Sequence, residues 1–285
     1  METLFEIIQD ALIDSLKMLP FLFGAYLLIE YLEHHSSERM ERLLAGSSRF
    51  GPVSGALLGC VPQCGFSVAA ANLYSGRIIT PGTLVAVFLS TSDEALPILL
   101  ANPGNLGVIG KLIAIKVVLA IAVGMGLDLL LRARRGSGAG ERRAHMERLC
   151  EHCHCEEHGI LRSALRHTVE IFVFVLIVSI VLGGVVEWLG PERLSALLLG
   201  GSLLQPAVAA LLGFIPNCAA SVLLTSLYLE GTISFGAVVA GLSTSAGVGF
   251  LVLFRVNRDL KENLRLCGVV YLAGFAAGTL IQLLA

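Results

Sequence analysis

Two short segments place thiol, carboxamide and hydroxyl side chains inside long apolar stretches. Residues 57–76 read LLGCVPQCGFSVAAANLYSG, and residues 211–230 read LLGFIPNCAASVLLTSLYLE. At a constant offset of 154 residues, nine of the twenty positions are identical. Thiols suit soft metal ions, whereas amide and hydroxyl oxygens suit harder cations; the alternative is a packing kink with cysteine as an apolar filler. The candidate binding residues in the two copies are Pro62, Gln63, Cys64, Ser67, Pro216, Asn217, Cys218 and Ser221.

A second repeated motif combines hydroxyl groups with two acids. The sequence LSTS occurs at 89–92 and, after a one-residue slip, at 242–245. A charged residue inside a membrane segment costs about 2.5–3.5 kcal/mol, so such residues usually face a cavity and function there. We expect cation binding or proton exchange here, the alternative being acids that are merely solvated at the membrane interface. The candidate residues are Ser90, Thr91, Ser92, Asp93, Glu94, Ser243, Thr244 and Ser245.

A third cluster lies in the polar middle of the chain, which reads CEHCHCEEHG from residue 150. Thiolates and imidazoles at short spacing suit zinc or softer metals, so four of the six side chains could form a tetrahedral site. The spacing is not that of a standard zinc finger, and a polar loop without metal is the alternative. The candidate ligands are Cys150, His152, Cys153, His154, Cys155 and His158. We expect no cofactor beyond a metal ion bound in this linker.

Composition identifies a membrane protein. The chain is 55% hydrophobic and only 15% charged, and its long uncharged stretches match the roughly 20 apolar residues that a membrane-spanning helix needs. A net charge of −2 argues against a nucleic-acid partner, and the acidic N-terminus does not resemble a cleavable signal peptide. The predicted apolar segments are 11–32, 51–76, 80–101 and 105–131, then 164–189, 195–230, 233–254 and 264–284. They predict a first transmembrane repeat at 1–131, a cytoplasmic linker rich in His, Cys and Arg at 132–160, and a second repeat at 161–285.

Basic residues change sides between the halves. The loop 33–50 carries three arginines, while its counterpart 190–195 carries one; the loop 102–110 is uncharged, while its counterpart 255–265 carries four basic residues. Because cytoplasmic loops are enriched in Lys and Arg, this pattern predicts inverted repeats. Lys111 and Lys116 are expected to snorkel or to pair within their own helix.

The segment 51–76 is too long for a simple crossing, since one helix of that length would span roughly 40 Å. Pro62 in its middle would break the helix. We therefore expect an all-α polytopic membrane protein with two inverted-topology repeats. Each repeat contains a proline-broken re-entrant hairpin, with its tip at Pro62 or at Pro216.

The segment GALLGCVPQCGFSVAAANLYSGRIITPGTLVAVFLSTSDEALPILLA, at 55–101, resembles the signature of a ten-helix heavy-metal exporter family. Members of that family are also labelled manganese transporters or arsenic efflux proteins. The proline–cysteine hairpin is more distantly similar to that of the organoarsenical permeases. The resemblance implies efflux of a metal or metalloid ion across a bacterial-type inner membrane.

The leading hypothesis is a proton-coupled secondary transporter that is not an enzyme. The chain lacks the GxxxxGK[ST] phosphate loop of an ATPase. The alternatives are an uncoupled ion channel and a membrane thiol-redox enzyme that uses Cys64 and Cys218. The expected partners are a metal or metalloid ion and the lipid bilayer, and the sequence leaves a homo-oligomer open.

Overall fold

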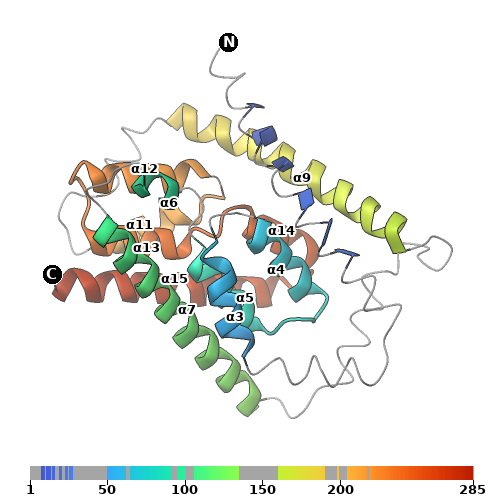
Figure 1. Cartoon of the computed structure of the whole chain (residues 1–285), viewed down its shortest axis with the longest axis horizontal. Coiled ribbons are helices and arrows are strands. Elements are labelled where there is room, and N and C mark those ends of the chain that lie inside the picture. The colour runs from blue at the N-terminus through green and yellow to red at the C-terminus, as the bar shows by residue number, and fades with distance from the viewer. Residues whose placement is uncertain are drawn as a thin grey trace.

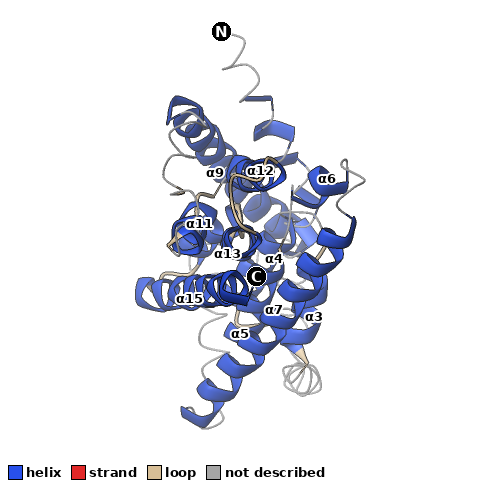
Figure 2. Ribbon diagram, turned by 90° about the vertical axis from the view of Figure 1, so that its left-hand side faces the viewer, coloured by secondary structure: helices blue, strands red, loops and turns tan. Residues whose placement is uncertain are grey.

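Every secondary-structure element that the structure, a computed structural model, describes is a helix (Figures 1 and 2). The all-α class is therefore confirmed. The described residues are 50–61, 65–91, 95–100, 106–134, 160–189, 198, 204–216 and 218–284, with single positions between 8 and 27.

The helices of the second half repeat the order of those in the first. The first half contains α3 (Gly51–Gly59), α4 (Gly65–Ser75), α5 (Pro81–Ser90), α6 (Ala95–Leu100) and α7 (Leu106–Arg134). The second half contains α9 (Ile160–Leu189), α11 (Gln205–Gly213), α12 (Cys218–Leu229), α13 (Phe235–Thr244), α14 (Val248–Val256) and α15 (Leu260–Leu284). The bounds of α3 and α5 recur in α11 and α13 at the offset that relates the two sequence copies.

Matching local signals explain the matching helix starts. Thr80 caps α5 by accepting a hydrogen bond from the Thr83 amide at 3.1 Å, and Pro81 begins the helix. Ser234, which corresponds to Thr80 in the second half, caps α13 by accepting from the Ala237 amide at 3.1 Å. These hydroxyls satisfy amides that have no partner inside the helix.

Each half contains two interruptions in its apolar segments. The segment 51–76 forms two helices, because α3 ends at Gly59 and α4 begins at Gly65. In the second half α11 ends at Gly213, two residues before the Ile215–Pro216 step, in agreement with the loss of a backbone donor at proline. The predicted segments 80–101 and 233–254 are also interrupted, between α5 and α6 and between α13 and α14. Gly247 adopts a φ of 53° at the second of these breaks, a conformation that glycine accepts without a steric cost.

Glycines allow the closest helix pairs to form. α5 packs between α3 and α7, and α13 packs between α11 and α15. A Cβ atom added at Gly82 would lie 2.2 Å from the carbonyl oxygen of Gly124, and one added at Gly236 would lie 2.3 Å from that of Gly278. Both α5–α7 and α13–α15 therefore bring backbone against backbone, as small residues do between membrane helices.

The two halves pack together through their shorter helices. α4 of the first half lies along α14 of the second, and α12 of the second half contacts α6 of the first (Figure 1). Phe88 on α5 packs edge-on against Phe250 on α14, with ring centroids 4.7 Å apart. The hydrophobic core is therefore shared between the halves.

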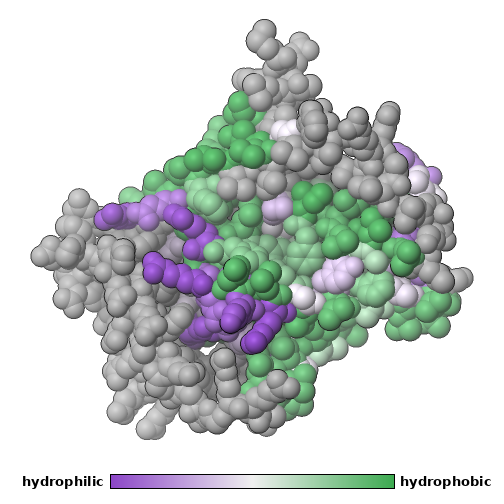
Figure 3. Space-filling view, turned by 180° about the vertical axis from the view of Figure 1, so that it is seen from behind, coloured by the Kyte–Doolittle hydropathy of each residue, from purple (hydrophilic) through white to green (hydrophobic). Residues whose placement is uncertain are grey.

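Long apolar stretches lie both inside the protein and on its outside: Phe235–Val256 is mostly buried, whereas Gly107–Leu131 on α7 and Leu260–Leu284 on α15 are mostly exposed. Three described stretches are long and apolar enough to cross a membrane, namely Gly107–Leu131, Phe235–Val256 and Leu260–Leu284. Large apolar side chains such as Val118, Leu129 and Leu272 are exposed on α7 and α15. Figure 3 shows a broad apolar surface with a cluster of hydrophilic side chains toward one end. These features agree with a multi-pass membrane protein whose apolar surface faces lipid.

Candidate functional site

Many predicted site residues lie outside the described part of the chain. They are Pro62, Gln63, Cys64, Ser92, Asp93, Glu94 and Asn217, and the linker residues Cys150, His152, Cys153, His154, Cys155 and His158. Cys218 begins α12, but its side chain is not described. The proposed roles of all these residues stay predictions.

The described hydroxyl groups of the two LSTS motifs lie where α5 and α13 end. The hydroxyls of Ser90 and Thr91 donate to carbonyls of their own helix, at 2.9 Å to Ala86 and 2.7 Å to Val87. Thr244 donates to the carbonyl of Ala210 on α11 at 2.7 Å. The hydroxyl of Ser243 is fully buried and has no hydrogen-bond partner in the described part of the chain.

The helix ends also correct the alignment of the two LSTS motifs. α5 ends at Ser90 and α13 at Thr244, so Ser90 corresponds to Thr244 at the same offset as the rest of the repeat. Their neighbours agree: an added Cβ at Gly59 would lie 2.1 Å from the Ser90 hydroxyl, and one at Gly213 would lie 2.2 Å from the Thr244 hydroxyl. The one-residue slip is therefore wrong, because it follows letter identity and ignores the position of the helix end.

Lys116 is a central residue of this region that the sequence reasoning misjudged. Its side chain is fully buried in α7. Its ammonium donates to the backbone carbonyl of Thr91 and, at 2.6 Å, to that of Leu242. The prediction that Lys116 snorkels or pairs within its helix is wrong, whereas Lys111 is exposed. The sequence signal was the position of Lys116 inside a long apolar stretch, since no charged residue follows Lys116 until Asp128.

The two carbonyls that bind Lys116 belong to helix ends from different halves. The last four carbonyls of a helix lack partners within it and carry partial negative charge. At the end of α13, the amide of Ala246 donates to the Thr244 carbonyl at 3.0 Å, and the Leu242 carbonyl accepts from the lysine. One ammonium therefore joins the interrupted end of α5 to that of α13. We call the Thr91 and Leu242 carbonyl oxygens the carbonyl pair.

Two predicted serines, Ser67 and Ser221, lie near the starts of α4 and α12. Ser67 on α4 is fully buried against α14, where an added Cβ at Gly249 would lie 2.7 Å from the Ser67 Cβ. Ser221, its counterpart on α12, is also buried, and Pro216 before that helix is half-buried. The structure thus brings Ser67 to the start of a helix from the other half.

Cys60 is a thiol that the predicted site omitted. It caps the end of α3, is half-buried, and donates to the Ala56 carbonyl with its Sγ at 3.2 Å. It precedes Cys64 by four residues, and this Cys-x3-Cys spacing was the signal that could have identified it.

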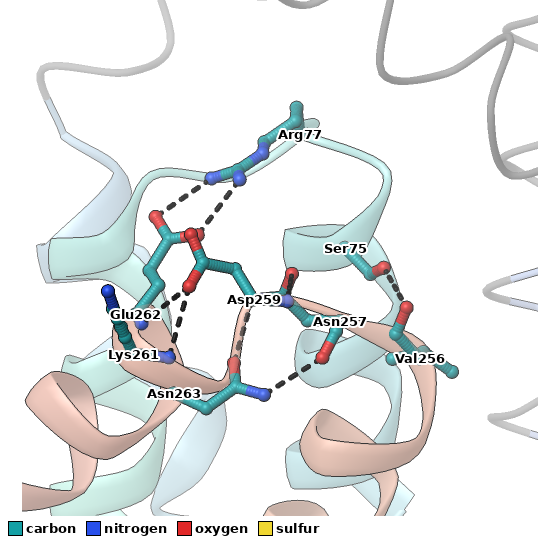
Figure 4. A network of polar contacts seen from close by, with 8 residues as sticks. All are labelled: Ser75, Arg77, Val256, Asn257, Asp259, Lys261, Glu262 and Asn263. Atoms are coloured by element: carbon teal, nitrogen blue, oxygen red, sulfur yellow. Dashed lines mark hydrogen bonds and ion pairs between the residues drawn. The ribbon is translucent and has the colours of Figure 1, made fainter.

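A polar cluster joins the halves where α4 ends and α15 begins (Figure 4). Arg77 donates to both carboxylate oxygens of Glu262, at 3.1 and 2.9 Å. Ser75 donates to the carbonyl of Val256 at 3.0 Å, and Asp259 caps α15 by accepting from the Lys261 amide at 3.0 Å. Burial by itself would lower the pKa of Arg77, but hydrogen bonding to Glu262 and its negative charge outweigh burial and raise that pKa above its usual value.

Arg77 occupies a turn position that normally favours glycine. Its φ is 56°, and Gly231 at the corresponding turn of the second half has a φ of 74°. A residue with a Cβ is strained in this conformation. The two-point pair with Glu262 offsets that strain, and the corresponding turn of the second half has no such arginine.

We expect Glu262→Gln to lower the free energy of unfolding by about 1.5–3 kcal/mol, the usual contribution of hydrogen bonds to charged groups. The measurement is thermal unfolding of the full chain in detergent. Lys261→Gln is the matched control, because Lys261 is exposed on the same turn. Equal midpoints for the two variants would show that the pair does not hold the halves together.

Within the described residues, no group of three or more His, Cys, Asp or Glu side chains could hold a metal ion.

A family model described as "Putative, 10TM heavy-metal exporter" matches residues 1–197 and again 185–285. No curated protein and no solved structure matches the chain.

Proposed function

Because the chain belongs to the family of ten-transmembrane-helix heavy-metal exporters, we propose that it is a secondary-active transporter that moves a heavy-metal or metalloid ion out of the cytoplasm. Apart from family membership, the observation that best supports the proposal is that the ends of α5 and α13, where the two apolar segments are interrupted, both bind the buried ammonium of Lys116. Interrupted helices near the middle of a membrane are where transporters bind ions, since their ends carry partial charges.

We propose that each half contains a re-entrant hairpin. In support, α3 and α5 run in the same direction: Gly51 lies beside Thr83 and Gly59 beside Ser90. α4 connects the end of α3 to the start of α5, so it returns toward the side from which α3 came. In the second half, Gln205 at the start of α11 accepts from the Ser234 amide at the start of α13, at 2.9 Å.

We further propose that the repeats are inverted. The first hairpin opens beside Arg77, which pairs with Glu262 at the start of α15. The second opens beside Ser234, whose hydroxyl donates to Gln282 at the end of α15, at 3.4 Å. Because α15 is one uninterrupted helix, its two ends lie on opposite sides of the protein. Basic residues cluster near its start, so that side is the cytoplasmic one, in a bacterial-type inner membrane.

The proposed ligands are the side chains at the two hairpin tips and the acids after α5. Cys64 and Cys218 would bind a soft ion, while Gln63, Asn217 and the carboxylate of Asp93 would bind a harder one such as manganese. Protonation of Asp93 and Glu94 would release the ion and couple export to the proton gradient. Alternating access would follow from one half rocking against the other around this region.

The test is to delete the gene in its own host, re-express it, and measure the cellular content of manganese, zinc, cadmium and arsenic. We expect the deletion strain to accumulate at least one of them and re-expression to reverse this. Re-expressed Cys64→Ser/Cys218→Ser should fail to reverse accumulation of a soft ion or metalloid and should still reverse that of manganese. No change for any of the four elements would exclude the export proposal.

A further inference from the structure

Lys116 is enclosed on all sides by the protein. It is fully buried in α7, within the apolar stretch Gly107–Leu131 that is long enough to cross the membrane. Lysine is almost never fully buried unless it is paired, and a charge at this depth normally has a function. Val270, at the corresponding position of α15, is fully buried and apolar. One lysine therefore serves both halves of the protein.

The carbonyl pair has the properties of a cation-binding cradle. Its oxygens come from helix ends whose dipoles point negative charge toward the same point. An ammonium already occupies that point, so the cradle is compatible with a cation in this structure.

We propose that the Lys116 ammonium is a tethered cation that occupies part of the ion's binding site in the unloaded transporter, and that the transported cation displaces it from the carbonyl pair. This inference rests on the proposed export function and deepens it. A divalent cation has a higher charge density than an ammonium and therefore gains more from two carbonyl oxygens at negative helix ends. When the ion leaves, the lysine returns, so the buried carbonyls do not remain without a partner.

Displacement also restricts the substrate class. A neutral metalloid acid has no charge with which to replace an ammonium at two negative helix ends. The inference therefore assigns this subsite to a divalent cation. Any soft metalloid would bind at the thiols and leave Lys116 in place.

The test is calorimetric binding of Mn²⁺, Zn²⁺ and Cd²⁺ to the purified full chain in lipid nanodiscs. If the Lys116 ammonium is away from the carbonyl pair about 1–10% of the time, replacing Lys116 by a neutral residue raises the apparent affinity for the cation by about 10–100-fold. We expect Lys116→Met to show this gain for at least one of these ions, with arsenite binding unchanged. Lys111→Met is the matched control, because Lys111 is exposed on the same helix.

Lys116→Gln repeats the test if the methionine variant does not fold, since glutamine donates hydrogen bonds without a charge. Lys116→Arg keeps the charge and should show no gain. Unchanged or weaker cation binding in a folded neutral variant would overturn the inference, as would the absence of cation binding in every form. The export assay separates the two claims: a gain in affinity without export in cells would show that a cation competes with Lys116 for the carbonyl pair and would reject the proposed function.

Discussion

Gly124→Val is expected to lower the thermal unfolding midpoint by about 6–12 °C, taking a cost of about 3 kcal/mol and about 2–4 °C per kcal/mol. An added Cβ at Gly124 would lie 2.6 Å from the Gly82 carbonyl oxygen and 3.0 Å from the side chains of Ala86 and Pro52. A backbone oxygen cannot turn aside as a flexible side chain can. The valine must therefore push the first half of α5 away from α7.

The same helix provides the control for this prediction. Gly126 lies two residues further on, and an added Cβ there meets nothing within 4 Å. Gly126→Val should therefore unfold near the wild-type temperature, with both variants measured in the same detergent. Gly278→Val tests the second half, because an added Cβ at Gly278 would lie 2.4 Å from the Gly236 carbonyl oxygen. If Gly124→Val and Gly126→Val unfold together, the close approach of α5 and α7 is wrong.

Asp93→Asn is expected to reduce export by about 100-fold or more. Removing a group that only supports a metal ligand already weakens metal binding by about 10–100-fold, and loss of a direct carboxylate should cost at least as much. Glu94→Gln should behave similarly if both acids act together. The corresponding position in the second half is Gly247, so the second half cannot replace the lost charge.

The measurement is ion uptake into inside-out vesicles that carry a proton gradient. Glu230→Gln is the control, because Glu230 is an exposed acid at the turn after α12. Exchange of labelled for unlabelled ion, measured without a proton gradient, separates two roles of Asp93. If Asp93 is a ligand of the ion, Asp93→Asn should also lose exchange. If Asp93 only couples transport to protons, exchange should remain. Full gradient-driven export by Asp93→Asn would remove that acid from the mechanism.

Sequence reasoning located the repeated segments because their signals are local. Proline and an apolar run each act over a few residues, so the break near Pro216 and the start of the apolar segment at residue 80 could be predicted directly. The same reasoning misaligned LSTS by one residue, because four identical letters outweighed helix ends that no local signal marks. It also treated 80–101 as one segment, since the break after α5 contains no proline.

The duplicated unit, the membrane setting and the family membership were determined by the sequence alone, since each depends on composition or on a pattern along the chain. Only the tertiary structure decided which groups meet. Lys116 binds carbonyls that lie 25 and 126 residues away, and Arg77 pairs with an acid 185 residues away. Backbone carbonyls are the same in every residue, so no sequence pattern identifies those that a buried ammonium will bind. Such partners depend on where helices from the two halves end in space.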